Sequence, residues 1–220
     1  MFFFFRKKPD LSEFFSNGID RHCHILPGVD DGVPTMDESL AIIREMKRAG
    51  LRGACCTPHI MKRFPNTPAS LKGGFCELAA RAKAEEDFPL WLAAEYMVDE
   101  SFDDKLRAGD LLLWEDKYLL VELPQYMLPP GWMDSLCHIQ ELGYTPLLAH
   151  PERYGRILDL DDLEDMARQG ILFQGNIGSI NGYYGSRTKS LARELHRRGL
   201  YNCWGTDTHS INMFRRVTRA

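Results

Sequence analysis

Residues 20–38 read DRHCHILPGVDDGVPTMDE, and this stretch defines the structural unit from which the chain is built. It begins as a short strand on which His22 and His24 project to the same side, because side chains alternate along an extended chain. A loop rich in proline and glycine follows. Thr35 and Glu38 then form the capping-box pattern that opens a helix. The unit is a strand, a loop with polar side chains, and a helix.

The same arrangement returns along the chain, because five further apolar runs each end on a residue type that binds metals. The six runs supply nine candidate ligands: His22, His24, Asp31, His59, Glu95, Glu122, His150, Asp207 and His209. Histidine and carboxylate without cysteine suit manganese, zinc or ferrous iron. A catalytic zinc takes about three protein ligands, so this number indicates a multinuclear and hydrolytic site. For any one of these residues, a surface histidine or an ion pair is the alternative interpretation.

Strands and helices alternate over the whole chain, which predicts an α/β fold with a parallel sheet. We expect strands at 18–23, 51–57, 89–95, 118–123, 144–150, 171–176 and 201–206, with 111–114 as an extra hairpin or edge piece. We expect helices at 35–49, 70–86, 99–108, 131–142, 160–169 and 187–198. The ligands follow the C-terminal ends of the strands, where (β/α) barrels place their active sites. We therefore predict a distorted seven-stranded (β/α)7 TIM-like barrel, with an open doubly wound sheet as the alternative.

The string His150-Pro-Glu-Arg-Tyr154 combines a ligand with a basic side chain. Arg153 presents a planar fork of donors that suits a phosphate, and we expect Glu152 to orient it. An ordinary surface arginine is the alternative. The sequence lacks both the cysteine-x5-arginine loop of cysteine-dependent phosphatases and the glycine-rich nucleotide loops. The chemistry is therefore expected to depend on the metals.

The composition is that of one soluble domain of 220 residues with a net charge of −4, which argues against a nucleic-acid binder. Its six cysteines form no C-x-x-C pair, which favours reduced thiols in a cytoplasmic protein. No apolar run approaches the length of a membrane span.

We divide the chain into an N-terminal tail, residues 1–17, and a single barrel domain, residues 18–220. The tail carries Phe2 to Phe5, which we interpret as a mobile segment or a plug against the barrel. A membrane-surface or partner-docking motif is the alternative.

The ordered motifs resemble those of the polymerase-and-histidinol-phosphatase (PHP) superfamily, and within it the bacterial capsule and exopolysaccharide tyrosine phosphatases of the CpsB/YwqE type. The matching strings are DRHCHILPGVDDG from Asp20, TPH ending at His59, AEYMVDE from Ala94, HPERY from His150 and GTDTH ending at His209. The likeness spans about residues 18 to 212.

This resemblance implies the PHP barrel and three divalent metals, with manganese favoured and ferrous iron or zinc as alternatives. It implies one ion held by His22, His24, Glu122 and Asp207, and a second by Glu122 and His150. Asp31, His59, Glu95 and His209 would surround the third.

The resemblance also implies a second phosphate-binding arginine after the final histidine. Phe214 stands at the expected position, and we favour its neighbour Arg215 over Arg216. Relatives usually continue into a last helix, so we expect a short closing helix here before Ala220.

The expected reaction is hydrolysis of protein phosphotyrosine by a metal-bridged hydroxide, with Arg153 stabilising the phosphoryl charge and His209 supplying a proton to the leaving phenolate. Four tyrosines are candidates for stacking on the substrate ring or for loop packing: Tyr126, Tyr154, Tyr183 and Tyr184. The family likeness suggests the tail of a bacterial tyrosine autokinase in polysaccharide export as the substrate. The alternatives are a small-molecule phosphatase, such as a histidinol-phosphate phosphatase, and a non-catalytic metal-stabilised interaction protein.

Overall fold

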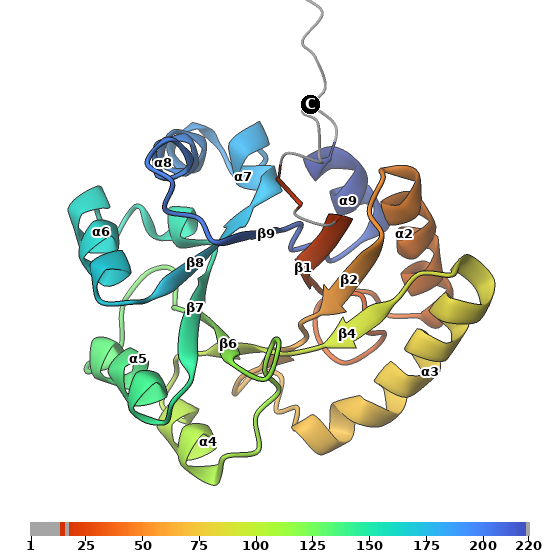
Figure 1. The fold of residues 1–220 in the computed structure, drawn as a ribbon, viewed down its shortest axis with the longest axis horizontal. Coiled ribbons are helices and arrows are strands. Elements are labelled where there is room, and N and C mark those ends of the chain that lie inside the picture. Colours follow the sequence, from red (N-terminus) through yellow and green to blue (C-terminus); the bar gives the residue numbers. More distant parts are fainter. Residues whose placement is uncertain (1–13, 16–17, 219–220) are drawn as a thin grey trace, which may run out of the picture.

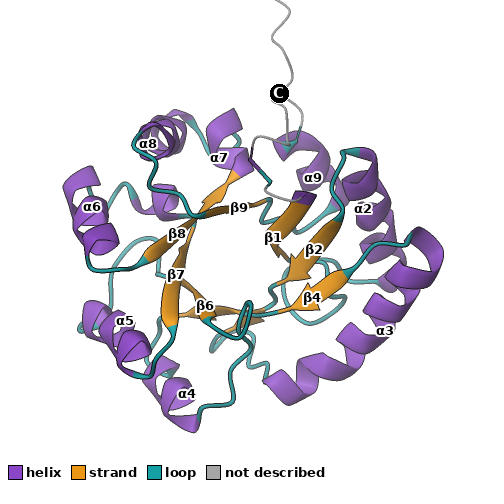
Figure 2. Cartoon of the chain, in the orientation of Figure 1, coloured by secondary structure: helices purple, strands orange, loops and turns teal. Residues whose placement is uncertain are grey.

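A computed structural model describes residues 14–15 and 18–218, and it shows a ring of strands surrounded by helices (Figure 1). The strands are β1 (Ile19–Cys23), β2 (Gly53–Cys56), β3 (His59–Ile60), β4 (Leu90–Leu92), β5 (Glu95–Met97), β6 (Tyr118–Glu122), β7 (Thr145–Ala149), β8 (Leu172–Asn176) and β9 (Cys203–Gly205). The helices are α2 (Met36–Arg48), α3 (Pro68–Glu86), α4 (Phe102–Ala108), α5 (Trp132–Glu141), α6 (Leu160–Arg168), α7 (Ile177–Asn181), α8 (Ser186–Arg197) and α9 (Ile211–Val217), with a 3₁₀ turn η2 (Pro151–Tyr154). The helices lie on the outside of the strands (Figure 2).

Every pair of neighbouring strands is parallel, in one sheet of order β1-β2-β4 and another of order β3-β5-β6-β7-β8-β9. β2 and β3 are two parts of one pass of the chain, separated by Thr57 and Pro58, and β4 and β5 are separated by two alanines. The described strands therefore trace seven passes. The predicted parallel α/β fold is confirmed.

The first and last strands approach each other at their C-terminal ends. The amide of His24 donates to the carbonyl of Thr208 (2.9 Å), and the amide of Asp207 donates to the carbonyl of His22 (2.7 Å). Gly205 allows this approach, because a β-carbon there would lie 2.4 Å from that of His22. These contacts link β9 to β1 beside the residues that the sequence marks as ligands.

Two local expectations differ from the structure. Residues 111–114 form no strand; only Trp114 pairs, in an isolated antiparallel bridge with Tyr118. The chain turns sharply between them, since Glu115 and Asp116 both adopt the left-handed conformation, with φ of 51° and 54°. The short elements η2 and α7 follow β7 and β8 directly and were not predicted.

The main core lies between the strands and the helices, and it includes Phe14 and Phe15 from the segment expected to be a tail. The ring of Phe14 packs edge-on against Trp204 at 4.9 Å, so the barrel core also receives side chains from the segment before residue 18. The Phe2–Phe5 motif lies outside the described residues. The closing helix α9 is short, and it buries Phe214 and Val217.

A smaller apolar cluster of Leu120, Leu147 and Ala149 is separate from the main core. Leu120 and Glu122 face the same side of β6 because side chains alternate along a strand. The cluster thus lies on the strand faces that carry the polar side chains described below. None of the helices in the described part of the chain is long and apolar enough to cross a membrane.

Candidate metal centre

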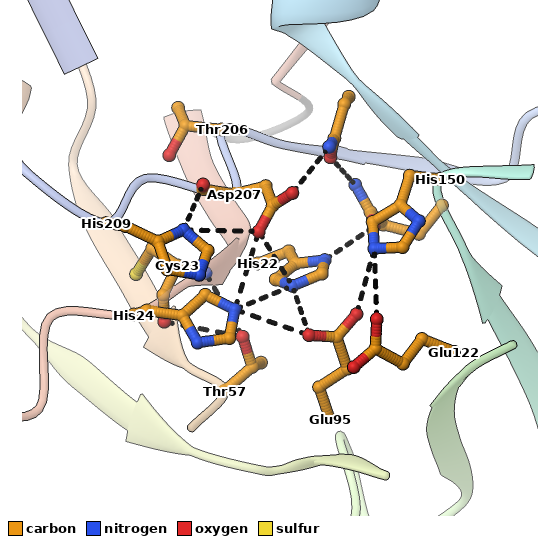
Figure 3. Close-up of polar contacts among 12 residues, drawn as sticks. His22, Cys23, His24, Thr57, Glu95, Glu122, His150, Thr206, Asp207 and His209 are labelled. Atoms are coloured by element: carbon orange, nitrogen blue, oxygen red, sulfur yellow. Dashed lines mark hydrogen bonds and ion pairs between the residues drawn. The ribbon is translucent and has the colours of Figure 1, made fainter. Parts of the chain in front are cut away.

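The nine sequence-predicted ligands come together at the C-terminal ends of the strands, as the barrel expectation requires. Figure 3 shows most of them pointing toward one another. Seven are buried: His22, His24, His59, Glu95, Glu122, His150 and Asp207. The side chains of Asp31 and His209 are 43% and 25% exposed, so these two lie at the rim of the cluster.

Glu95 lies at the centre of the cluster. Its Oε2 is 3.3 Å from Nε2 of both His22 and His24, and 3.2 Å from Nδ1 of His59. Its Oε1 is 3.0 Å from Nε2 of His150. One carboxylate therefore contacts four imidazoles that come from three different passes of the chain, since His22 and His24 share the first pass.

Asp207 is a second buried carboxylate, opposite Glu95. Its Oδ1 lies 3.5 Å from Nε2 of His22 and 3.4 Å from Nε2 of His24. Its Oδ2 accepts from Arg153 Nη1 (3.0 Å) and from Asn176 Nδ2 (2.8 Å). Its φ of 52° is in the left-handed region, which disfavours non-glycine residues, so the surrounding contacts hold a strained backbone here.

An outer group forms around the exposed Asp31. Its Oδ1 lies 3.6 Å from Nε2 of His59 and 3.5 Å from Nε2 of His209. The His24 and His209 rings stack with centroids 4.0 Å apart. Donor atoms of these four residues lie within 4.8 Å of one another, close enough to surround one ion.

The inner donors divide into two further groups by the same 4.8 Å criterion: His22, His24 and Glu95, and then His59, Glu95 and Glu122. Glu95 thus belongs to two groups and Glu122 to one. His24 and His59 also belong to two groups each, and Glu95 is a register partner of His59 across β3 and β5. The expected sharing of Glu122 between two ions stays a prediction.

Six buried side-chain polar atoms of the described residues have no hydrogen-bond partner, and three of them belong to candidate ligands: Nδ1 of His59, Oε2 of Glu95 and Oε1 of Glu122. Unpaired buried polar groups are costly, and buried charges are normally paired or bound to metals. All three atoms face the same cluster, and no cysteine belongs to any of the three groups. The residues present therefore fit hard-to-borderline divalent cations.

The charges of the cluster shift its pKa values strongly. Burial alone disfavours the protonated form of His22, but Glu95 and Asp207 outweigh it and raise the pKa of His22 to about 9. Burial also opposes ionisation of Glu95, yet the charges of His22 and His59 hold its pKa well below the ordinary value. Burial also opposes ionisation of Asp207, yet His22 and His24 hold its pKa well below the ordinary range. The site therefore favours ionised carboxylates surrounded by positive charge.

Several residues that orient the ligands were not predicted. Nδ1 of His22 lies 2.6 Å from Oε1 of Gln174, and Nδ1 of His24 lies 2.8 Å from Oδ2 of Asp30. These bonds leave the Nε2 atoms of both histidines directed at Glu95. Such partners fix the ring orientation of metal-binding histidines. The only signal in the sequence was that Asp30 precedes the predicted ligand Asp31.

Arg153 extends from η2 toward Asp207, and its guanidinium also lies over the ring of Tyr184 at 4.9 Å. The expectation that Glu152 orients it is wrong. Glu152 is buried, and its oxygens accept from the amide of Asn176 (3.0 Å) and the hydroxyl of Tyr201 (2.9 Å).

The structure does not bring Arg215 to the cluster. Its Nη2 pairs with Oε1 of Glu45 on α2 (2.7 Å), because α9 packs against α2. Arg216 instead lies over the ring of Tyr183 at 4.7 Å, and Tyr183 packs edge-on against Tyr184. Of the two arginines considered, Arg216 is the one directed toward the tyrosines beside Arg153.

The remaining candidate tyrosines differ in exposure. Tyr154 is fully buried, with its hydroxyl 3.4 Å from Nδ1 of His150, so it orients a candidate ligand and is unavailable to a substrate ring. Tyr126 is 83% exposed and stays available for stacking.

Comparison with known proteins gives consistent matches over almost the whole described chain. The family model for capsular polysaccharide synthesis proteins of the CpsB/CapC type matches residues 18–217. The tyrosine-protein phosphatase YwqE of Bacillus subtilis is 31% identical over 198 residues, covering 88% of this chain and 78% of YwqE. The tyrosine-protein phosphatase CpsB of Streptococcus pneumoniae is 28% identical over 207 residues, covering 88% and 84%. A crystal structure from work on YwqE and CpsB as metal-dependent tyrosine phosphatases matches with a TM-score of 0.80 at 30% identity, covering 89% of this chain and 81% of the other.

Proposed function

The chain belongs to the CpsB/CapC family of capsular polysaccharide synthesis, and from this membership we propose that it is a metal-dependent protein-tyrosine phosphatase. The observation that carries the proposal is Glu95, a buried carboxylate with an unpartnered oxygen among three imidazole nitrogens. That arrangement suits a divalent cation, and Arg153 beside it suits a phosphate.

We propose that three divalent ions bind here, with manganese favoured over ferrous iron or zinc. The three overlapping donor groups support this number, and their nitrogen and oxygen atoms support the choice of metal. We also propose a cytoplasmic location, because all six cysteines are free.

When bound, the ions would activate a water molecule and neutralise charge on the phosphoryl oxygens. Arg153 would bind a phosphoryl oxygen through the donors that Asp207 and the amide oxygen of Gln125 leave free, since Gln125 accepts from Nε (3.3 Å) and Nη2 (2.5 Å). Asp207 and the ring of Tyr184 fix the guanidinium, so little side-chain entropy is lost when it binds. We assign the second phosphate contact to Arg216 rather than Arg215, because Arg216 faces Tyr183.

His209 was expected to act as ligand and as proton donor. Its Nδ1 lies 2.8 Å from the carbonyl oxygen of Asp207, which requires the proton to be on Nδ1. Nε2 is the ring nitrogen that faces the Asp31 group, 3.5 Å from Oδ1 of Asp31, so we favour the ligand role. A phenolate leaving group needs little proton assistance, since tyrosine has a pKa of about 10.

The substrate that we propose is a phosphotyrosyl protein, specifically the tail of a bacterial tyrosine autokinase in capsule or exopolysaccharide biosynthesis. The names of the relatives support a phosphotyrosyl protein, and the family description supports a role in capsule synthesis. The kinase tail is proposed from the family resemblance alone.

The test compares three preparations of the protein: as purified, treated with chelator, and then supplied with manganese. We expect hydrolysis of a phosphotyrosyl peptide to be lost with chelator and restored by manganese, with the metal-to-chain ratio measured by elemental analysis. Histidinol phosphate is the competing substrate, and faster turnover of it would assign the site to small-molecule hydrolysis. Activity that survives complete chelation, or that never appears, would contradict the metallophosphatase proposal.

A further inference from the structure

A hollow of about 400 Å³ is lined by Arg153 but not by Asp207, which accepts from the same guanidinium. Its walls come from the segment after β7 and from the first turn of α8, with the exposed Tyr126 at its edge. Arg153 and Tyr184 line the hollow and also contact Asp207, so these two residues join it to the metal centre.

The hollow contains two positively charged side chains in addition to Arg153. Arg156 and Arg187 line it and are exposed. Within the described residues, neither has a carboxylate within 4.0 Å. Glu152 is the one acidic side chain of the lining, and both its oxygens are occupied by Asn176 and Tyr201. Two cationic side chains therefore face the hollow without a compensating anion.

The first turn of α8 adds to this potential. Gly185, Ser186 and Thr188 line the hollow, and no side chain caps the start of this 12-residue helix. Amide groups at an uncapped helix start carry partial positive charge. The amide groups of α8 thus add a smaller positive potential to the charge of the two arginine side chains.

We propose that this hollow is a subsite for a second anionic group of the peptide substrate, located close to the phosphotyrosine that is hydrolysed. The inference rests on the proposed phosphatase function. Arg153 contacts the scissile phosphate, while Arg156 and Arg187 bind a carboxylate or a second phosphate on a neighbouring side chain. A peptide with clustered negative charge is therefore preferred to one with a lone phosphotyrosine.

The test measures kcat/KM for peptides that differ at one position. Each peptide has one phosphotyrosine and, at each position up to four residues away, alanine, glutamate or phosphonomethyl-phenylalanine. The phosphonate cannot be hydrolysed, so it reports a second phosphate without adding a second reaction. We expect the preferred anionic peptide to exceed the alanine peptide about fivefold, as for a partly exposed ion pair. The preference should shrink in 0.5 M salt, because salt screens exposed charges.

The decisive variants are Arg156→Ala and Arg187→Ala, alone and together. They should reduce the preference to about one while leaving hydrolysis of p-nitrophenyl phosphate unchanged, since that substrate has no second anion. Arg193→Ala is the matched control, because Arg193 is an exposed arginine of the same helix that does not line the hollow. It should keep the full preference.

The glutamate peptides report binding of a carboxylate, and the phosphonate peptides report binding of a second phosphate. A preference for either anionic peptide over the alanine peptide that depends on Arg156 and Arg187 supports the subsite. Equal rates for all peptides in the active wild-type protein, or a preference that survives both substitutions, would overturn it. Absence of activity toward every phosphotyrosine substrate would instead refute the proposed function.

Discussion

Chelation should reverse the way in which the stability of this protein depends on pH. In the chelated protein the buried carboxylates hold a proton on His22, whose pKa rises from the ordinary 6.5 to about 9. A group with a raised folded-state pKa stabilises the fold fully below the unfolded value and loses this contribution as pH rises through the folded value. The difference from 6.5 to about 9 corresponds to about 3.5 kcal/mol in all, at about 1.4 kcal/mol per pH unit. The pKa values of His24 and His59 move in the same direction.

Manganese should produce the opposite trend, because metal binding requires deprotonated imidazole nitrogens. Stabilisation by a ligand at about 100 times its dissociation constant is about 2.7 kcal/mol. Between pH 6.5 and 9 the unfolding free energy should therefore fall by about 3 kcal/mol with chelator and rise with manganese.

Urea unfolding at pH 6.5 and pH 9, with and without manganese, provides the measurement. His138→Gln is the control, because His138 lies on α5 outside the three donor groups and should leave both trends unchanged. A chelated protein that is equally stable or more stable at pH 9 would refute the reasoning.

Three substitutions probe the centre itself. Glu95→Gln should lower metal content and reduce kcat/KM by more than about 100-fold. Glu152→Gln is the control and should retain the metal, because Glu152 is equally buried but lies outside the donor groups. Equal metal content in both variants would contradict the role of Glu95. Arg153→Lys should lower kcat/KM about 100-fold with metal content unchanged, and a wild-type rate would remove Arg153 from phosphate binding. Gly205→Ala should destabilise the protein by about 1–3 kcal/mol and weaken metal binding, because the new β-carbon would collide with that of His22. Thermal unfolding with and without manganese measures the stability and the metal binding. An unchanged unfolding midpoint would show that β1 and β9 can move apart without cost.

The ligands could be predicted from the sequence because each one follows an apolar run that ends at the same side of a parallel sheet. His22 and His24 illustrate this, since strand alternation alone places both rings on one face. Predicting these positions did not require knowledge of which strands are neighbours. Predicting the residues that orient the two rings did require that knowledge. Gln174 contacts His22 across 152 positions of sequence, and nothing near Gln174 marks it as a partner.

The second arginine shows a limit of another kind. Adjacent residues on a helix point about 100° apart, so the expected position after the final histidine could not distinguish Arg215 from Arg216. The packing of α9 gives the two arginines different neighbours. Glu45 on α2 pairs with Arg215, which leaves Arg216 on the side of Tyr183.

The position of Glu95 follows from breaks in two neighbouring strands. The sequence shows one of these breaks as Pro58, but only the structure shows that the two breaks are aligned. Pro58 has no amide hydrogen, so β2 cannot continue as a regular strand, and pairing resumes at His59 in a different sheet. The neighbouring pass breaks at the same level, after β4, and resumes at Glu95. His59 and Glu95 are then register partners at the start of β3 and β5. Two aligned breaks therefore place an imidazole beside a carboxylate at the first position of each resumed strand, which makes Glu95 rather than Glu122 the carboxylate common to two donor groups.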